Sequence, residues 1–246
     1  MKMSLFLYLE YPKGANNMKL FTDPQGNPKT NKSMKGGYYT PVLHMLPANL
    51  SGFNVCSKAS KGCKIACLNT AGRGGILKKG ETTNVIQEAR RKRTLMYFQD
   101  RKAFYSQLSR EIKNAENRAK KRGLKLAIRL NGTSDLRHEN SGIMDEFKHV
   151  QFYDYTAIPN RRNLPSNYHL TFSRKEDNNQ DVLKAIKRGL NVAVVFEKYL
   201  PKTYLGLPVF NGDDTDLRFT DPKKSIIGLV AKGKAKKDTS GFTVNQ

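Results

Sequence analysis

The stretch YHLTFSRKEDNNQDVLKAIKRGLNVAVVF, residues 168–196, decides the fold expected for this chain. It begins and ends with short apolar runs, 168–173 and 191–196, with little polar alternation, which is typical of parallel strands buried on both faces. Between them, DVLKAIKRG (181–189) has apolar residues at helical spacing and a glycine stop. A strand, a helix and a further strand in this order predict an α/β fold.

The same pattern extends outward from this unit. Similar apolar runs occur at 124–130, 150–155, 207–210 and 225–231. A helical tract from Thr82 to about Lys121, broken near Asp100 and stopped by Gly123, comes before them. We expect a partial (βα) barrel-like parallel sheet, and the alternative is an open doubly wound sheet.

The length of 246 residues suits one large domain. We predict a single α/β domain at 18–246, preceded by an N-terminal extension at 1–17 of uncertain role. The extension has a brief apolar run interrupted by Glu10, without the small-residue cleavage site of a signal peptide. Residues 19–50 are rich in proline and glycine and are expected to be mostly irregular.

The chain is strongly basic, with 44 Lys+Arg against 21 Asp+Glu and a net charge of +23. Such an excess favours a polyanionic partner, DNA or RNA, with contacts at the basic segments 90–93 and 232–237. The alternative is a solvated surface without a partner. A membrane span needs roughly 20 apolar residues, which no stretch approaches, so we expect no membrane partner.

All three cysteines, Cys56, Cys63 and Cys67, lie in the loop 54–75 in a C-x6-C-x3-C pattern. An odd, clustered set suits a metal site better than disulfides. A [4Fe–4S] cluster held by three thiolates with one open iron is the leading interpretation. A Zn²⁺ site with a fourth protein ligand and a set of buried structural thiols remain alternatives. His44 could be that fourth ligand or a packed side chain.

Polar side chains follow the apolar runs, and parallel strands bring such positions to one edge of a sheet. The turn preferences of Asn, Asp and Ser are the competing explanation. We expect catalytic roles for Asp135, Asp213 and Arg174. We expect substrate-binding roles for Asn131, Ser134, Tyr155, Ser173, Glu176, Asp216 and Lys232.

Several motifs together resemble a phage-encoded family, the gene-product-88-like proteins, from about Met18 to Val244. These motifs are GYYTPVLHMLPANLSGFNVCSKASKGCKIACLNTAGRG, AIRLNGTSDL, QFYDYT, YHLTFSR, NVAVVF and NGDDTDLRFTDP. The resemblance implies a bacteriophage origin and a location in the host-cell cytoplasm, and it assigns no reaction.

A second resemblance is to radical S-adenosylmethionine enzymes, which place three cysteines around a [4Fe–4S] cluster beside a partial (βα) barrel. Their cysteine spacing is C-x3-C-x2-C, and a Gly-Gly-Glu segment follows their next strand; this chain has neither. The resemblance therefore implies the architecture more than S-adenosylmethionine binding.

Two functions follow as hypotheses. The first is an iron–sulfur enzyme that performs redox, radical or Lewis-acid chemistry on a substrate at the strand ends. The second is a nucleic-acid-binding or processing protein of phage replication, with a structural or redox-sensing cluster, or zinc.

Overall fold

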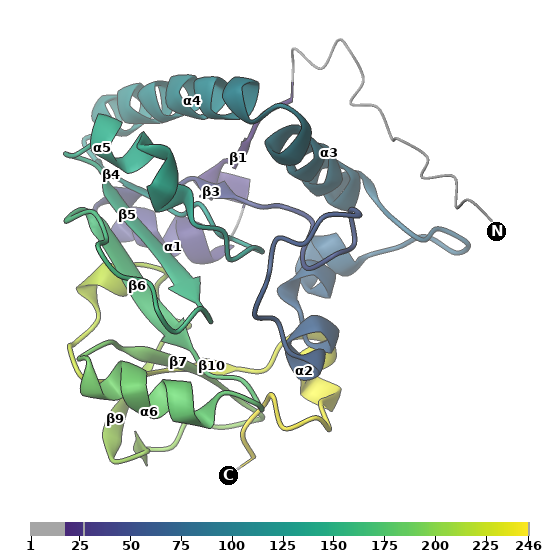
Figure 1. Cartoon of the computed structure of the whole chain (residues 1–246), viewed down its shortest axis with the longest axis vertical. Helices are drawn as coiled ribbons and strands as arrows, with labels where there is room; N and C mark the ends of the chain where they lie inside the picture. The colour runs from purple at the N-terminus through teal and green to yellow at the C-terminus, as the bar shows by residue number, and fades with distance from the viewer. Residues whose placement is uncertain (1–17, 27, 246) are drawn as a thin grey trace, which may run out of the picture.

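An eight-stranded sheet forms the centre of the computed structural model, which describes residues 18–26 and 28–245 (Figure 1). The strand order is β2-β4-β5-β6-β7-β10-β9-β8, and neighbouring strands are parallel except β9 and β8. The strands are β2 (Tyr38–Tyr39), β4 (Lys125–Ile128), β5 (Gln151–Thr156), β6 (Tyr168–Ser173), β7 (Val192–Phe196), β8 (Thr203–Tyr204), β9 (Leu207–Asn211) and β10 (Ile226–Val230). A separate antiparallel pair joins β1 (Phe21–Thr22) to β3 (Val42–Leu43). The predicted extension 1–17 lies outside the described residues.

All six predicted apolar runs are strands of this sheet, which confirms a mostly parallel α/β architecture. From β2 to β7 the order follows the chain in one direction, whereas a doubly wound sheet reverses at a switch point. Strand β10 then inserts between β7 and β9. No hydrogen bonds between described residues join the outer strands β2 and β8, so this part of the chain forms no closed barrel.

One face of the sheet, here called the apolar face, is covered by helices. At one end α4 (Arg101–Lys121) packs Phe104 and Leu108 against a core that includes Leu170. At the other end α6 (Asn179–Lys187) packs against a core that includes Phe172. Because Leu170 and Phe172 are two residues apart on β6, they point to the same side, and both helices cover that face.

The opposite face, here called the polar face, carries the alternate side chains. Tyr153 and Tyr155 of β5 pair in register with His169 and Thr171 of β6. The 3-10 helix η5 (Arg218–Thr220) covers them, with the Phe219 ring 5.5 Å from the Tyr153 ring. The sheet therefore has one apolar face and one polar face, and η5 covers part of the polar face.

The predicted break near Asp100 and the stop at Gly123 are confirmed, and the helical tract begins at Val85 rather than at Thr82. Helix α3 (Val85–Gln99) ends at Asp100, whose carboxylate accepts a hydrogen bond from Ala103 N and so caps α4. Gly123 has φ 64° just after α4, as the stop requires.

The expectation of mostly irregular structure at 19–50 is wrong for one segment. Helix α1 (Pro28–Lys35) forms there, although its sequence, PKTNKSMK, has little apolar periodicity. Its first residue is proline, which the first helical position favours because its N–H is not needed there.

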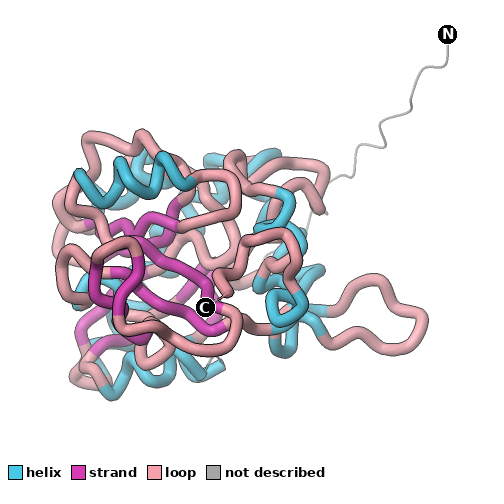
Figure 2. The backbone as a smooth tube through the Cα atoms, turned by 90° about the horizontal axis from the view of Figure 1, so that it is seen from below, coloured by secondary structure: helices cyan, strands magenta, loops and turns pink. Residues whose placement is uncertain are grey.

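The remaining elements are short. They are η1 (Pro24–Gly26), α2 (Lys61–Ile65), η2 (Leu68–Thr70), η3 (Gly72–Gly75), η4 (His138–Ser141), α5 (Ile143–Glu146) and η6 (Gly233–Lys237). Figure 2 shows the C-terminal end beside the strands, where Val244 bridges to Phe196. Across the described ranges no helix has both the length and the apolar composition that crossing a membrane demands.

Candidate functional site

The cysteine segment 54–75 lies across the carboxyl ends of β4 and β6. The Glu176 carboxylate, just after β6, accepts hydrogen bonds from Gly62 N (2.7 Å) and Ser60 Oγ (2.8 Å). Ser60 in turn caps α2 by accepting from Cys63 N. Cys56 Sγ lies 3.8 Å from Thr133 O, in the segment after β4. Glu176, predicted to bind substrate, therefore positions the cysteine segment.

The three thiols lie near one another and are partly buried. Burial raises the pKa of Cys56 to about 11, and negative charge on Cys67 adds to the rise. Burial raises the pKa of Cys63 to about 12, with further contributions from Cys67 and Cys56. Within the described residues, no three His, Cys, Asp or Glu side chains are grouped closely enough to hold a metal ion. The thiols are thus neighbours without forming an assembled ligand set.

Two buried cations flank the thiols. Arg90 of α3 is 9% exposed, and its Nη1 donates to two uncharged oxygens of Asn69, at 2.6 and 3.3 Å. Burial lowers the pKa of Arg90, while the Cys67 thiol raises it. Lys175, 5% exposed, lowers the pKa of Cys63 and pairs with Asp177 at 2.7 Å. A negative charge at the cysteines would find compensation here.

A charged network occupies the polar face. Arg129 Nη1 lies 3.3 Å from Asp216 Oδ2, and Tyr153 Oη donates to the same carboxylate at 3.3 Å. The Arg129 guanidinium stacks 4.7 Å from the centre of the Tyr155 ring. Burial alone would lower the pKa of Arg129, but Asp216 and the phenols raise it. This network brings together two predicted residues, Tyr155 and Asp216.

Several buried polar atoms on the same face have no hydrogen-bond partner in the described part of the chain. They are Tyr155 Oη, His169 Nε2, Thr171 Oγ1 and Arg218 Nη1. Leaving such a group unpaired costs about 1–3 kcal/mol, so each of these atoms needs a partner such as a bound water. The Arg218 atom is a donor, the two hydroxyls can donate or accept, and the role of His169 Nε2 depends on its tautomer.

The other predicted residues fall into separate groups. Asn131 Oδ1 accepts from Ser134 Oγ at 2.8 Å, and Asn131 N donates to Asp154 at 2.7 Å. Burial raises the pKa of this Asp154 carboxyl to about 6. Asp135 binds Arg161 at 3.2 Å and accepts from Ala157 N, and so holds the loop after β5.

The last group lies toward the C-terminus. Asp213 pairs with Lys232 at 2.7 Å and accepts from Val230 N. Arg174 donates to Gly241 O and Phe242 O and so anchors the C-terminal segment. Ser173 O accepts from Asn178 Nδ2 at 2.9 Å. Asp135, Asp213 and Arg174, which we predicted to act together, thus each contact different partners.

His44 is packed beside Gly132 and shares a hydrogen bond of 3.3 Å between its Nδ1 and Thr22 Oγ1. Burial, and then Arg90, Arg129 and Arg93, lower its pKa to about 3. This neutral imidazole lies among cations rather than among the cysteines.

The structure places four residues at the site that the sequence patterns did not indicate: Arg90, Arg129, His169 and Arg218. Arg129 and His169 are charged or polar residues inside otherwise apolar runs, a signal that could have identified an inward polar face. Arg90 was hidden in the run 90–93, which we had assigned to the surface as a unit.

No curated protein and no solved structure matches the chain. A family model described as Gene product 88 matches residues 16–246, nearly the whole length. This match, which includes the cysteine segment and every strand of the sheet, shows that the chain belongs to the phage Gene product 88 family.

Proposed function

We propose that Cys56, Cys63 and Cys67 bind a [4Fe–4S] cluster through three thiolates and leave one iron without a cysteine ligand. The observation that carries this proposal is the position of three neighbouring thiols between two buried cations at the carboxyl edge of a parallel sheet. Thiolates are the ligands that iron–sulfur clusters take. Arg90 and Lys175 would stabilise the negative charge of the thiolates and cluster.

Three cysteine thiols are the ligand type that an iron–sulfur cluster takes. Within the described residues they do not lie close enough together to hold a metal ion. Their segment consists of α2, two short 3-10 helices and connecting loops, and binding the cluster would need these loops to move. Glu176 fixes α2 to the sheet, which keeps Cys63 at the edge while the rest of the segment adjusts.

The bound cluster would supply redox, radical or Lewis-acid chemistry at its open iron. The chain itself would position a polar substrate on the polar face, with Arg129 and Asp216 as charged contacts and Tyr155 as a stacking or hydrogen-bonding partner. Asp135, already held by Arg161 and Ala157, would support the loop that borders this face. We also propose a barrel-like curvature of the sheet, because both helices α4 and α6 cover one face and leave the other polar.

The test is anaerobic purification and reconstitution with iron and sulfide, followed by metal and sulfide analysis. We expect about four irons and four sulfides per chain. Each single substitution, Cys56→Ser, Cys63→Ser or Cys67→Ser, should lower cluster content severely. Lys187→Gln, on the exposed side of α6, is the control and should leave it unchanged. Stoichiometric zinc with no iron uptake, or full iron binding by the three variants, would overturn the proposal.

A further inference from the structure

Helix α4 carries a row of cations on its solvent side. Lys102, Arg110, Lys113, Lys120 and Lys121 are all exposed. At 100° per residue they fall within an arc of about 100°, and at 1.5 Å per residue they extend over roughly 28 Å. Helix α4 has two carboxylates: Glu111 points to the other side, where it accepts from Leu20 N and Phe21 N, and Glu116, beside the arc, pairs with His149. We call this surface the α4 cationic face.

Four of these cations are available for a partner. In the described ranges, Lys102, Arg110, Lys120 and Lys121 form no ion pair with an acidic side chain, whereas Lys113 pairs with Glu146 at 3.4 Å. By contrast, the basic run 90–93 turns inward in part. Arg90 is buried, and Arg93 donates to the backbone oxygens of Lys19 and His44. The other predicted segment, 232–237, keeps its lysines exposed, with Lys232 paired to Asp213. The structure thus adds α4 as a candidate polyanion surface in place of 90–93.

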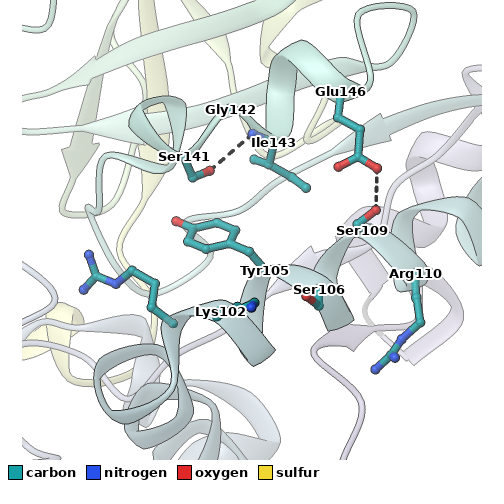
Figure 3. Close-up of a pocket in the computed structure, with 10 residues that line it drawn as sticks. Lys102, Tyr105, Ser106, Ser109, Arg110, Ser141, Gly142, Ile143 and Glu146 are labelled. Atoms are coloured by element: carbon teal, nitrogen blue, oxygen red, sulfur yellow. Dashed lines mark hydrogen bonds between the residues drawn. The ribbon is translucent and has the colours of Figure 1, made fainter.

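A groove borders the α4 cationic face. It has a volume of about 800 Å³ and lies between α4 and the turn from η4 to α5 (Figure 3). Figure 3 shows Lys102, Ser106 and Ser109 on its α4 side and Ser141 and Gly142 opposite. The carboxylate in the groove, Glu146, already accepts from Ser109 Oγ at 2.6 Å. Hydroxyls beside cations suit phosphate oxygens.

The composition of this face argues against insertion into a membrane. Membrane-surface helices pair a basic face with large exposed apolar side chains. The large exposed apolar residues among the described residues lie on other elements, for example Ile65, Val85 and Leu183, and none lies on α4. Unpaired cations with hydroxyls and no apolar anchor match a phosphodiester backbone better than a lipid surface.

We propose that the α4 cationic face and its adjoining groove bind the phosphodiester backbone of a nucleic acid. The cations along α4 contact successive phosphates, and the Ser106 hydroxyl donates a hydrogen bond to a phosphate oxygen at the end near Lys102. Backbone contacts carry little sequence information, so binding is expected to be sequence-tolerant. This inference is independent of the cysteines.

The test is fluorescence anisotropy with a labelled single strand and a labelled duplex of 20 nucleotides, at several salt concentrations. The test variant replaces Lys102, Arg110, Lys120 and Lys121 by Gln. The control replaces Lys184, Lys187, Lys198 and Lys202 by Gln, with the same loss of charge at the other end of the sheet (Figure 1). Glutamine keeps high helix propensity, so the fold of α4 should persist, which circular dichroism checks.

We expect wild type to bind one or both probes with a steep salt dependence. The α4 variant should bind at least tenfold more weakly at low salt, and the magnitude of its log–log salt slope should fall by about three for single-stranded or three to four for duplex probes. The control variant should stay within threefold of wild type. Equal losses in both variants, an unaffected α4 variant, or no wild-type binding at low salt would each overturn the proposal.

A second pair of variants tests the groove separately. Ser106→Glu places a negative charge at the exposed groove wall, and Ser106→Gln adds a neutral side chain of similar size. We expect Ser106→Glu to weaken binding at least threefold more than Ser106→Gln. Equal binding by the two would remove the groove from the proposal, and stronger retention on phosphatidylglycerol vesicles than on either probe would replace nucleic acid with a lipid surface.

Discussion

Arg90 is a buried cation beside the cysteine segment. It is buried in α3, donates to uncharged oxygens of Asn69, and interacts electrostatically with Cys67. A buried guanidinium without a carboxylate in these contacts is costly unless a negative group lies nearby. The proposed cluster with its thiolates supplies that group.

This leads to a prediction about reduction potential. Reducing a cluster adds negative charge, which a neighbouring cation stabilises. We expect Arg90→Gln to shift the cluster potential to more negative values and Arg90→Lys to retain most of the wild-type potential, measured by protein-film voltammetry. If the role of Arg90 were purely structural, the two variants would lower cluster content and stability. Their cluster reduction potentials would then not differ.

His44 gives a pH prediction at the same scale. Its pKa is lowered from 6.5 to about 3, so the unfolded chain binds a proton over this range that the folded chain does not. Its contribution to stability is therefore complete above pH 6.5 and is lost as the pH falls toward 3, by about 1.4 kcal/mol per pH unit below 6.

The check is urea denaturation of wild type and His44→Gln between pH 7 and pH 4. We expect the stability of wild type to fall more steeply than that of the variant as the pH is lowered. Parallel curves over this range would show that His44 does not titrate as its surroundings indicate.

The sequence identified polar residues at the strand ends, but it did not predict which side chains contact one another. Asp216 and Tyr155 do share a network, because both flank Arg129 on the polar face. Arg174 and Asp213 were expected beside them, but their partners lie in the C-terminal segment and at Lys232. Strand ends indicate an edge of the sheet, whereas side-chain direction depends on loop conformations that no periodicity encodes.

At the scale of elements, the contact between Glu176 and α2 holds the cysteine segment to the sheet. Glu176→Gln removes the charge and one of two acceptors for Gly62 N and Ser60 Oγ. We expect a loss of about 1–3 kcal/mol in unfolding free energy, together with reduced iron uptake. Glu197→Gln, after β7 and 3.9 Å from Lys198, is the matched control and should change both by far less.

The packing of η3 against η2 gives a second prediction for an element. A Cβ on Gly75 would lie 2.0 Å from the backbone oxygen of Thr70, so Gly75→Ala requires the backbone of the cysteine segment to shift. We expect lower thermal stability and lower cluster content. Gly80 is exposed, has a φ of 84°, and has nothing within 4 Å of the position that a Cβ would take. Gly80→Ala should therefore lower the unfolding free energy by about 1 kcal/mol and leave the cluster content unchanged. Similar behaviour of the two variants would contradict the close packing at Gly75.

The elements themselves were largely predictable. The apolar runs and the helix around 82–121 follow from hydrophobic periodicity, and Asp100 and Gly123 mark boundaries by capping chemistry. Helix α1 and strand β8 were missed because α1 has little apolar periodicity and β8 is only two residues long.

For the molecule as a whole, the parallel strands were predictable from the sequence. Whether the sheet closes into a barrel was not predictable. Strands β2 to β7 succeed one another in one direction, as a barrel requires, while the insertion of β10 beside β7 depends on long-range pairing. The same arrangement separates two surfaces. The polar face carries the network of Arg129 and Asp216, and the α4 cationic face is the solvent side of a helix that covers the apolar face.

The central claim is that the three cysteines hold a [4Fe–4S] cluster with one open iron. The most direct measurement is a low-temperature EPR spectrum of the anaerobically reconstituted, dithionite-reduced protein beside the triple variant Cys56→Ser/Cys63→Ser/Cys67→Ser, together with visible absorption. The account predicts a brown protein with a reduced-cluster signal that changes on adding a small ligand for the open iron, and no signal in the triple variant. A colourless, zinc-loaded or metal-free wild-type protein without that signal would contradict it.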